Sequence, residues 1–139
     1  MVSYRRILLK LSGEALKSDN NNIDPEMLKK VVTIVQSALD LGVEIAIVIG
    51  GGNIYRGAAL ASDGMNKITG DHIGMLATVM NALAISDAFK RNNIPSIVMS
   101  GFSIGGGVCD PFNHTKAKNA LSDGKVVIFS AGTGSPCFT

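Results

Sequence analysis

Short apolar runs alternate along the chain with longer stretches of helical periodicity. Residues 6–11 and 43–49 are mostly apolar, and the second run is rich in β-branched side chains and ends directly at three glycines. Similar runs occupy residues 94–99 and 125–130. Such runs are typical of strands in a parallel sheet, where both faces of a central strand are buried. The pattern predicts four strands.

Three segments between these runs have the spacing of helices. Residues 24–25 are Asp-Pro, an N-cap followed by proline at the first helical position, and apolar side chains then recur at helical spacing through residues 28–39 until Gly42 stops the helix. Residues 71–91 predict a second helix capped by its first residue, an aspartate, and residues 112–121 predict a short third one.

Strands that alternate with helices imply βαβ units with right-handed crossovers. Residues 100–110 contain three consecutive glycines and are predicted to form a loop or small hairpin. The fold class is therefore predicted to be α/β, a three-layer α/β/α sandwich with a mostly parallel sheet. The last strand ends in a glycine loop with no helix after it in the chain. We therefore expect one face of the sheet to be partly uncovered and to expose an apolar patch.

Composition narrows the class of protein. The 139 residues are 46% hydrophobic and 17% charged, which suits one domain with a sizeable core and excludes a disordered chain. Thirteen basic against eleven acidic residues, without a basic cluster, argue against a nucleic-acid partner. The two cysteines favour a reducing compartment. The apolar stretch 73–89 contains Asn81, Ser86 and Asp87, so we expect no membrane span and a cytoplasmic protein. Met75, Met80 and Met99 are expected to fill the core.

Sixteen glycines are the outlier, because about 7% glycine, roughly ten residues, is ordinary for a chain of this length. Glycines follow three of the predicted strands, at Gly13, at 50–52, and at Gly132 and Gly134. Ligands of parallel sheets bind beyond the carboxyl ends of the strands, and glycine lets backbone N–H groups approach an anion closely. Each glycine taken singly is equally consistent with a simple turn. Three such loops at one edge favour a phosphate-rich ligand.

Two common phosphate-binding patterns do not fit. The Walker A motif fails because residues 58–59 are Ala-Ala, and the Rossmann fingerprint fails because Tyr55 stands where its third glycine belongs. What remains are Lys10 and Arg56 as charges for phosphate oxygens, accompanied by small polar residues at Ser12, Asn53 and Thr133. Phosphoryl transfer depends mainly on positioning and charge neutralisation, so this set suits that reaction.

Four segments together resemble the bacterial UMP kinases of the amino-acid kinase superfamily. They are residues 10–14 (KLSGE), 50–57 (GGGNIYRG), 70–78 (GDHIGMLAT) and 131–139 (AGTGSPCFT). The resemblance implies an enzyme that transfers the γ-phosphoryl group of ATP to UMP to give UDP, a step in pyrimidine nucleotide biosynthesis. It also implies a homo-oligomer, a hexamer in the family, with GTP as a possible activator and UTP as a possible inhibitor. The Asp/Asn-rich loop 18–22 departs from the glycine-bearing loop that takes part in GTP activation in some members.

The resemblance also implies roles for single residues. Lys10 and Arg56 are expected to be catalytic. The ATP phosphates are expected at Lys10, Leu11, Ser12, Gly13, Gly52 and Arg56. UMP is expected at Gly51, Asp71, Thr133, Gly134, Ser135, Pro136, Cys137, Phe138 and Thr139, with Asp71 on the ribose hydroxyls. Mg²⁺ is the expected cofactor, carried by ATP without a metal ligand from the protein. The attacking UMP phosphate is already anionic, so no strong general base is expected.

Members of this family are considerably longer than this chain. Residues 1–139 are therefore expected to be the N-terminal, UMP-binding lobe of a truncated amino-acid kinase domain that lacks the lobe for the ATP base and is inactive alone. Two alternatives remain open. One is a related kinase for a carbamate or amino-acid acceptor, which has no ribose for Asp71 to hold. The other is a non-catalytic nucleotide-binding assembly module that uses helix 71–91 as a subunit interface.

Overall fold

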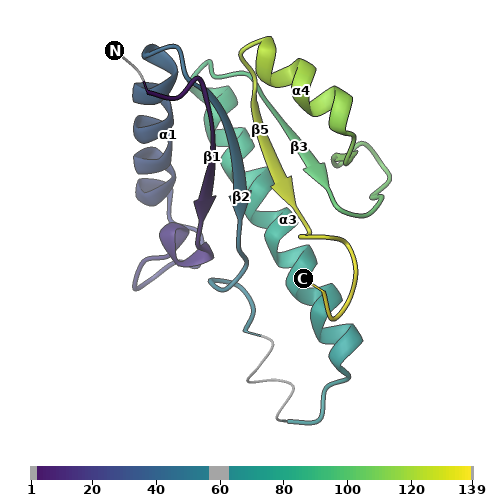
Figure 1. Ribbon diagram of the computed structural model, residues 1–139. Coiled ribbons are helices and arrows are strands. Elements are labelled where there is room, and N and C mark those ends of the chain that lie inside the picture. The colour runs from purple at the N-terminus through teal and green to yellow at the C-terminus, as the bar shows by residue number, and fades with distance from the viewer. Residues whose placement is uncertain (1–2, 57–62, 139) are drawn as a thin grey trace.

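A five-stranded parallel sheet in the order β1-β2-β5-β3-β4 organises the chain (Figure 1). The structure is a computed structural model and describes residues 3–56 and 63–138. Its elements in chain order are β1 (Arg6–Leu11), the 3₁₀ helix η1 (Gly13–Leu16), α1 (Pro25–Asp40), β2 (Glu44–Ile49), α3 (Lys67–Arg91), β3 (Ser96–Ser100), β4 (Asp110–Pro111), α4 (His114–Ser122) and β5 (Val126–Ser130). The four predicted strands and three predicted helices are confirmed, with bounds that differ by a few residues.

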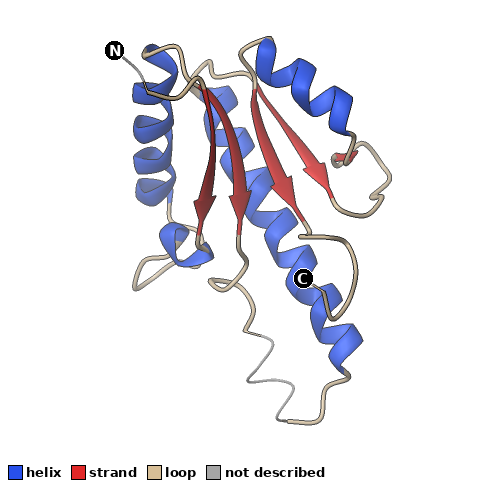
Figure 2. Cartoon of the chain, viewed as in Figure 1, coloured by secondary structure: helices blue, strands red, loops and turns tan. Residues whose placement is uncertain are grey.

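The sheet is the middle one of three layers, and helices pack against a hydrophobic core on each of its faces (Figure 2). On one face, Val35 of α1 and Phe89 of α3 pack against Ile47 and Ile128 of the two central strands, and all four side chains are fully buried. On the other face, α4 places three small or apolar side chains against β2 and β5 (Ala117, Ala120 and Leu121). The α/β/α sandwich predicted from the sequence is confirmed.

The edge strand β1 has only one covered face. Its residues alternate between exposed and half-buried, and Ile7, Leu9 and Leu11 pack on the cluster formed with α1 and α3. Period-two alternation places Leu8 and Lys10 on the opposite face. Leu8 is 62% exposed there, so β1 has one uncovered face. The uncovered face expected beside the last strand is not found, because β5 lies in the middle of the sheet and Val126, Val127 and Ile128 are fully buried.

Helix α1 begins and ends as its sequence predicts. The carboxylate of Asp24 accepts a hydrogen bond from the backbone N–H of Glu26 at 2.7 Å, Pro25 occupies the first turn, and Gly42 follows the helix with φ of 81°. Hydrogen bonds from the Ser18 hydroxyl and the Glu26 backbone hold the pKa of Asp24 below its ordinary value. The cap is therefore ionised at neutral pH, where a negative charge favours a helix N-terminus.

Helix α3 begins one turn earlier than predicted. Asn66 is its N-cap, with a side chain that accepts from the backbone N–H of Thr69 at 3.1 Å. The prediction that Asp71 is the N-cap is wrong. Asparagine caps a helix as well as aspartate does, and with the cap at Asn66 the Asp71 side chain makes another contact. Met75 is buried as expected, whereas Met80 is 53% exposed, so its assignment to the core is wrong.

The hairpin alternative for residues 100–110 is wrong, because β4 pairs with the end of β3 in parallel, Met99 opposite Asp110.

Helix α3 is long and apolar enough to cross a membrane, but 50% of its most apolar stretch is buried inside the fold. Its residues Ala82, Ile85 and Phe89 belong to the core, so α3 is accounted for as a core helix.

Candidate functional site

A pocket of about 270 Å³ lies beyond the carboxyl end of β2, between the loop after that strand and α3. Three residues expected at the site meet in its wall, namely Gly51 and Gly52 from the loop and Asp71 from α3. The remaining lining residues are Val48, Ile49, Tyr55, Gly70, Gly74, Met75, Thr78 and Gly132. The pocket thus brings a glycine loop and a carboxylate together, at the sheet edge where parallel sheets bind ligands.

Glycine is required in this region for close approach. A Cβ on Gly51 would lie 3.0 Å from the Cβ of Ala77 and 3.2 Å from the carbonyl oxygen of Gly74, so the loop rests directly on the α3 backbone. A Cβ on Gly13 would lie 2.5 Å from Oδ1 of Asn53 and 2.8 Å from the backbone nitrogen of Gly52. The loop after β1 and the loop after β2 are therefore packed against each other.

Asp71 is an ionised group at the rim of the pocket. Its Oδ2 accepts a hydrogen bond from the backbone N–H of Cys137 at 2.7 Å, and the ammonium group of Lys67 lies 3.1 Å away. The Cys137 N–H first, and then Lys67, hold the pKa of Asp71 below its ordinary value. The carboxylate also ties the end of the chain to α3, and Cys137 has a positive φ of 68° at that contact.

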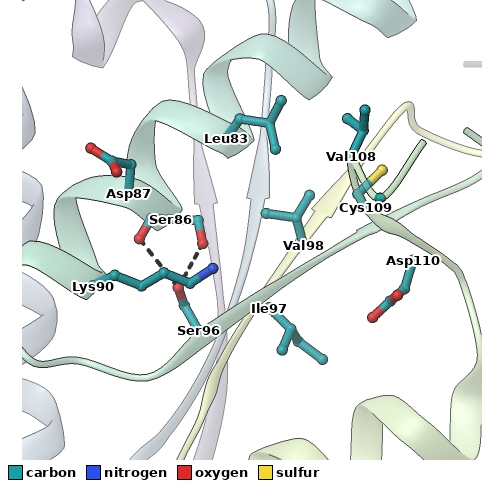
Figure 3. A pocket seen from close by; sticks show the side chains of 11 residues that line it. Leu83, Ser86, Asp87, Lys90, Ser96, Ile97, Val98, Val108, Cys109 and Asp110 are labelled. Atoms are coloured by element: carbon teal, nitrogen blue, oxygen red, sulfur yellow. Dashed lines mark hydrogen bonds between the residues drawn. The ribbon is translucent and has the colours of Figure 1, made fainter. Parts of the chain in front are cut away.

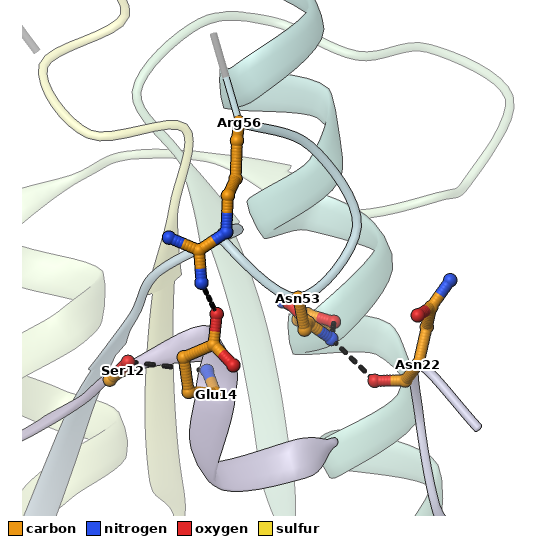
Figure 4. Close-up of polar contacts among 6 residues, drawn as sticks. Ser12, Glu14, Asn22, Asn53 and Arg56 are labelled. Carbon is orange, nitrogen blue, oxygen red and sulfur yellow. Dashed lines mark hydrogen bonds and ion pairs between the residues drawn. The ribbon is translucent and has the colours of Figure 1, made fainter. Parts of the chain in front are cut away.

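The charges expected at the donor phosphates lie at the end of β1. Arg56 forms an ion pair with Glu14, whose backbone N–H donates to the hydroxyl of Ser12 at 3.2 Å (Figure 4). The carbonyl oxygen of Leu11 accepts from the backbone N–H of Gly50 at 2.9 Å, which joins the two loops. Lys10 is exposed and has no ion-pair partner among residues 3–56 and 63–138. None of these residues lines the pocket, so their phosphate roles stay predictions.

The segment after β5 meets the pocket at two points. Gly132 lines it, and the Cys137 backbone reaches Asp71 at its rim. Thr133 lines a different pocket, beside Phe112 and Phe129, while Phe138 is 82% exposed. The side chains of Ser135 and Pro136 and the backbone of Gly134 are not part of the pocket wall, and Thr139 lies outside the described residues. The assignment of this segment to UMP stays a prediction.

Comparison with known proteins identifies the family. The model of the amino acid kinase family matches residues 5–137. The chain belongs to the amino acid kinase family. It is 69% identical over its whole length to the uridylate kinase of Ruthia magnifica and 57% identical over 137 residues to that of Stutzerimonas stutzeri. The crystal structure of UMP kinase from Bacillus anthracis matches 98% of the chain with a TM-score of 0.90 at 36% identity. The chain spans 58% of the Ruthia relative and 56% of the Bacillus chain.

Tyr55 and Thr78 are among the pocket residues of this amino acid kinase chain for which the sequence predicts no role there. The ring of Tyr55 packs 3.7 Å from the position of a Cβ on Gly74, and its hydroxyl lies 3.1 Å from Sδ of Met65. The hydroxyl of Thr78 accepts from the backbone N–H of Ala131 at 2.7 Å. The Gly-x-x-x-Gly spacing of residues 70 and 74 was the available signal for Tyr55, because it leaves a notch on one face of a helix.

No group of three or more His, Cys, Asp or Glu side chains suited to a metal ion occurs among the residues that the structure describes. At the glycine edge, Asp71 is paired with Lys67 and Glu14 with Arg56.

Proposed function

We propose that this chain is the acceptor-binding part of a kinase that transfers the γ-phosphoryl group of ATP to UMP. The observation that carries the proposal is the pocket that joins Gly51 and Gly52 to the ionised Asp71, in a chain 69% identical to a uridylate kinase. The glycine backbone supplies N–H donors for a phosphate, and an ionised carboxylate accepts hydrogen bonds from two vicinal hydroxyls. A nucleoside monophosphate offers both groups.

The donor side of the reaction is proposed at the end of β1. Lys10 is exposed and unpaired within the described chain, and supplies a point charge. Arg56 keeps guanidinium donors beyond the one bonded to Glu14, and these are available to phosphate oxygens. Mg²⁺ is proposed to arrive with ATP on the phosphate oxygens, where it would neutralise charge. We propose that residues 1–139 form the UMP lobe and that the ATP base is held outside them.

Assembly is proposed to use α3. Leu76, Met80 and Leu83 are exposed at 46%, 53% and 37%, and their spacing places them on one face of the helix. Such an apolar stripe supports a homo-oligomer, and the hexamer of the family is the proposed form. A cytoplasmic location, a role in pyrimidine biosynthesis, and regulation by GTP and UTP are proposed from the family resemblance.

Calorimetric titration with UMP, CMP and ATP tests the acceptor. We expect UMP to bind, and Asp71→Ala to weaken its binding at least tenfold, about 1.4 kcal/mol, because the ribose loses its acceptor. The matched control is Asp87→Ala, which removes an exposed carboxylate of the same helix that pairs with Arg91. Full UMP affinity in Asp71→Ala would favour an acceptor without ribose, as in the carbamate or amino-acid kinases. Absence of nucleotide binding together with oligomerisation in sedimentation would favour an assembly module.

A further inference from the structure

Two buried asparagines join the glycine loop after β2 to helix α3. Asn81 on α3 is fully buried and Asn53 in the loop is 5% exposed. Nδ2 of Asn53 donates to Oδ1 of Asn81 at 3.0 Å, and Nδ2 of Asn81 donates to Oδ1 of Asn53 at 2.7 Å. Asn81 also donates to the carbonyl oxygen of Gly50 at 2.7 Å. Asn53 also donates to the carbonyl oxygen of Asn22 at 2.8 Å (Figure 4).

The hydrogen bonds of this pair determine one orientation for each amide. A side-chain amide has two N–H donors, and those of Asn81 go to Gly50 at the start of the loop and to Asn53 at its end. Turning the Asn81 amide over would set its oxygen against the Gly50 carbonyl oxygen. Buried amides are strongly destabilising when their hydrogen bonds are lost, so the pair resists any movement of the loop away from α3.

The same pair sets the distance between the two glycine loops. Oδ1 of Asn53 occupies the space in which a Cβ of Gly13 would fall, at 2.5 Å. Between the two bonded ends of the loop, Gly51 rests on the α3 backbone beside Ala77 and Thr78. Asn81 itself does not line the pocket. It contacts the loop through the carbonyl oxygen of Gly50 and the side chain of Asn53, on the side away from the pocket wall.

We propose that Asn81 is a positioning residue for the phosphate-binding loop. Acting through Asn53 and Gly50, it holds the backbone of residues 50–53 in the geometry that receives a phosphate-bearing ligand. The identity of that ligand, UMP, rests on the proposed function, whereas the role of Asn81 in the free chain does not.

A matched control lies five residues further along α3, at Ser86. Ser86 of α3 and Ser96 of β3 are both buried, and their hydroxyls are hydrogen-bonded at 2.7 Å beside a separate pocket of about 270 Å³ (Figure 3). Ser86→Ala therefore removes a buried hydrogen bond of α3 that does not involve the glycine loop. A role of Asn81 in stability alone would make Asn81→Ala and Ser86→Ala differ only in their melting temperatures.

The test compares the wild-type chain, Asn81→Ala and Ser86→Ala by amide hydrogen exchange, thermal unfolding and calorimetric titration with UMP. We expect Asn81→Ala to speed exchange at residues 51–55 and to raise the Kd for UMP about tenfold, at 25 °C where all three are folded. Ser86→Ala is expected to lower the melting temperature and to leave both loop exchange and Kd unchanged.

Loop exchange and UMP affinity in Asn81→Ala that equal those of Ser86→Ala would overturn the proposal. If Asn81→Ala does not fold, Asn53→Ala opens the same network from the loop side, and unchanged exchange at residues 51–55 in that variant would overturn it equally. If the wild-type chain does not bind UMP, the proposed function fails. The exchange comparison in the free chain then still decides the role of Asn81.

Discussion

Replacing Gly13 by alanine tests the contact between the two glycine loops. The added Cβ would lie 2.5 Å from Oδ1 of Asn53 and 2.8 Å from the backbone nitrogen of Gly52, so a neighbour must retreat by nearly an ångström. Neither neighbour yields easily, because the Asn53 side chain is buried and bonded to Asn81, and Gly52 belongs to the loop backbone. We expect Gly13→Ala to push the loops apart.

The expected magnitude is about 2 kcal/mol, within the usual 1–3 kcal/mol for an added methyl group in a packed site. For a chain of this size, about 4 °C of melting temperature corresponds to 1 kcal/mol, so the expected fall is about 8 °C. UMP affinity should also fall, since Gly52 lines the pocket. Gly105→Ala is the control, because a Cβ at that glycine would have no atom within 4 Å. Urea unfolding and calorimetric titration of both variants provide the measurement.

Equal unfolding free energies for Gly13→Ala and Gly105→Ala, with unchanged UMP affinity, would refute this reasoning. That result would mean that the loops after β1 and β2 are not in contact as the structure shows. A large loss of stability in Gly105→Ala would also contradict the assignment of its surroundings as open space.

Three further changes follow from the caps, the ion pairs and the uncovered edge. Asp24→Ala should lower the unfolding free energy by about 1 kcal/mol in urea, because helix α1 loses its N-cap. Asp71 has a lowered pKa in the folded chain, so it contributes stability above its ordinary value of 3.8, and this contribution is lost as the pH falls through the lower folded value. The difference in unfolding free energy between wild type and Asp71→Ala should therefore shrink in acid unfolding below about pH 4. Leu8→Ala should cost less than about 1 kcal/mol by thermal unfolding, because Leu8 is 62% exposed on the uncovered face of β1.

Each of these changes has a control or a contrary outcome. Asp19→Ala removes an exposed carboxylate from the loop before α1, so an equal loss there would mean that Asp24 does not act as a cap. Asp87→Ala should not reproduce the acid dependence of Asp71→Ala. A loss for Leu8→Ala as large as that for Ile47→Ala, about 2–5 kcal/mol for a buried core residue, would mean that β1 is covered in solution.

Local signals predicted most of the fold. The β-branched run of residues 43–49 gave the buried strand β2, and Asp24-Pro25 gave the start of α1, because both depend on neighbours in the sequence. The start of α3 was placed wrongly because Asn66 and Asp71 are both good caps, and only the carboxylate contact with Cys137 shows that Asp71 has another partner. Contacts between distant segments carry no local signal.

In the candidate site, too, residues with a local sequence signal are predicted and residues defined by distant contacts are not. Gly51, Gly52 and Asp71 were found by glycine patterning and by the family resemblance, and the structure places them in one pocket. The sequence marks Asn81 only as a polar interruption of an apolar stretch, because its hydrogen-bond partners lie 28 and 31 residues away. Thr78 was missed as a pocket residue for the same reason, because its partner Ala131 is 53 residues away.

We propose that the pocket between the glycine loop and Asp71 binds UMP. Titration of the isotopically labelled chain with UMP, followed by the amide signals in NMR spectra, tests it most directly. We expect saturable shifts at Gly51, Gly52, Asp71 and Cys137. Shifts confined to the pocket around Ser86 and Ser96 would contradict this proposal. An unchanged spectrum at about millimolar UMP would contradict it as well, because even a Kd of about 1 mM would then give visible shifts.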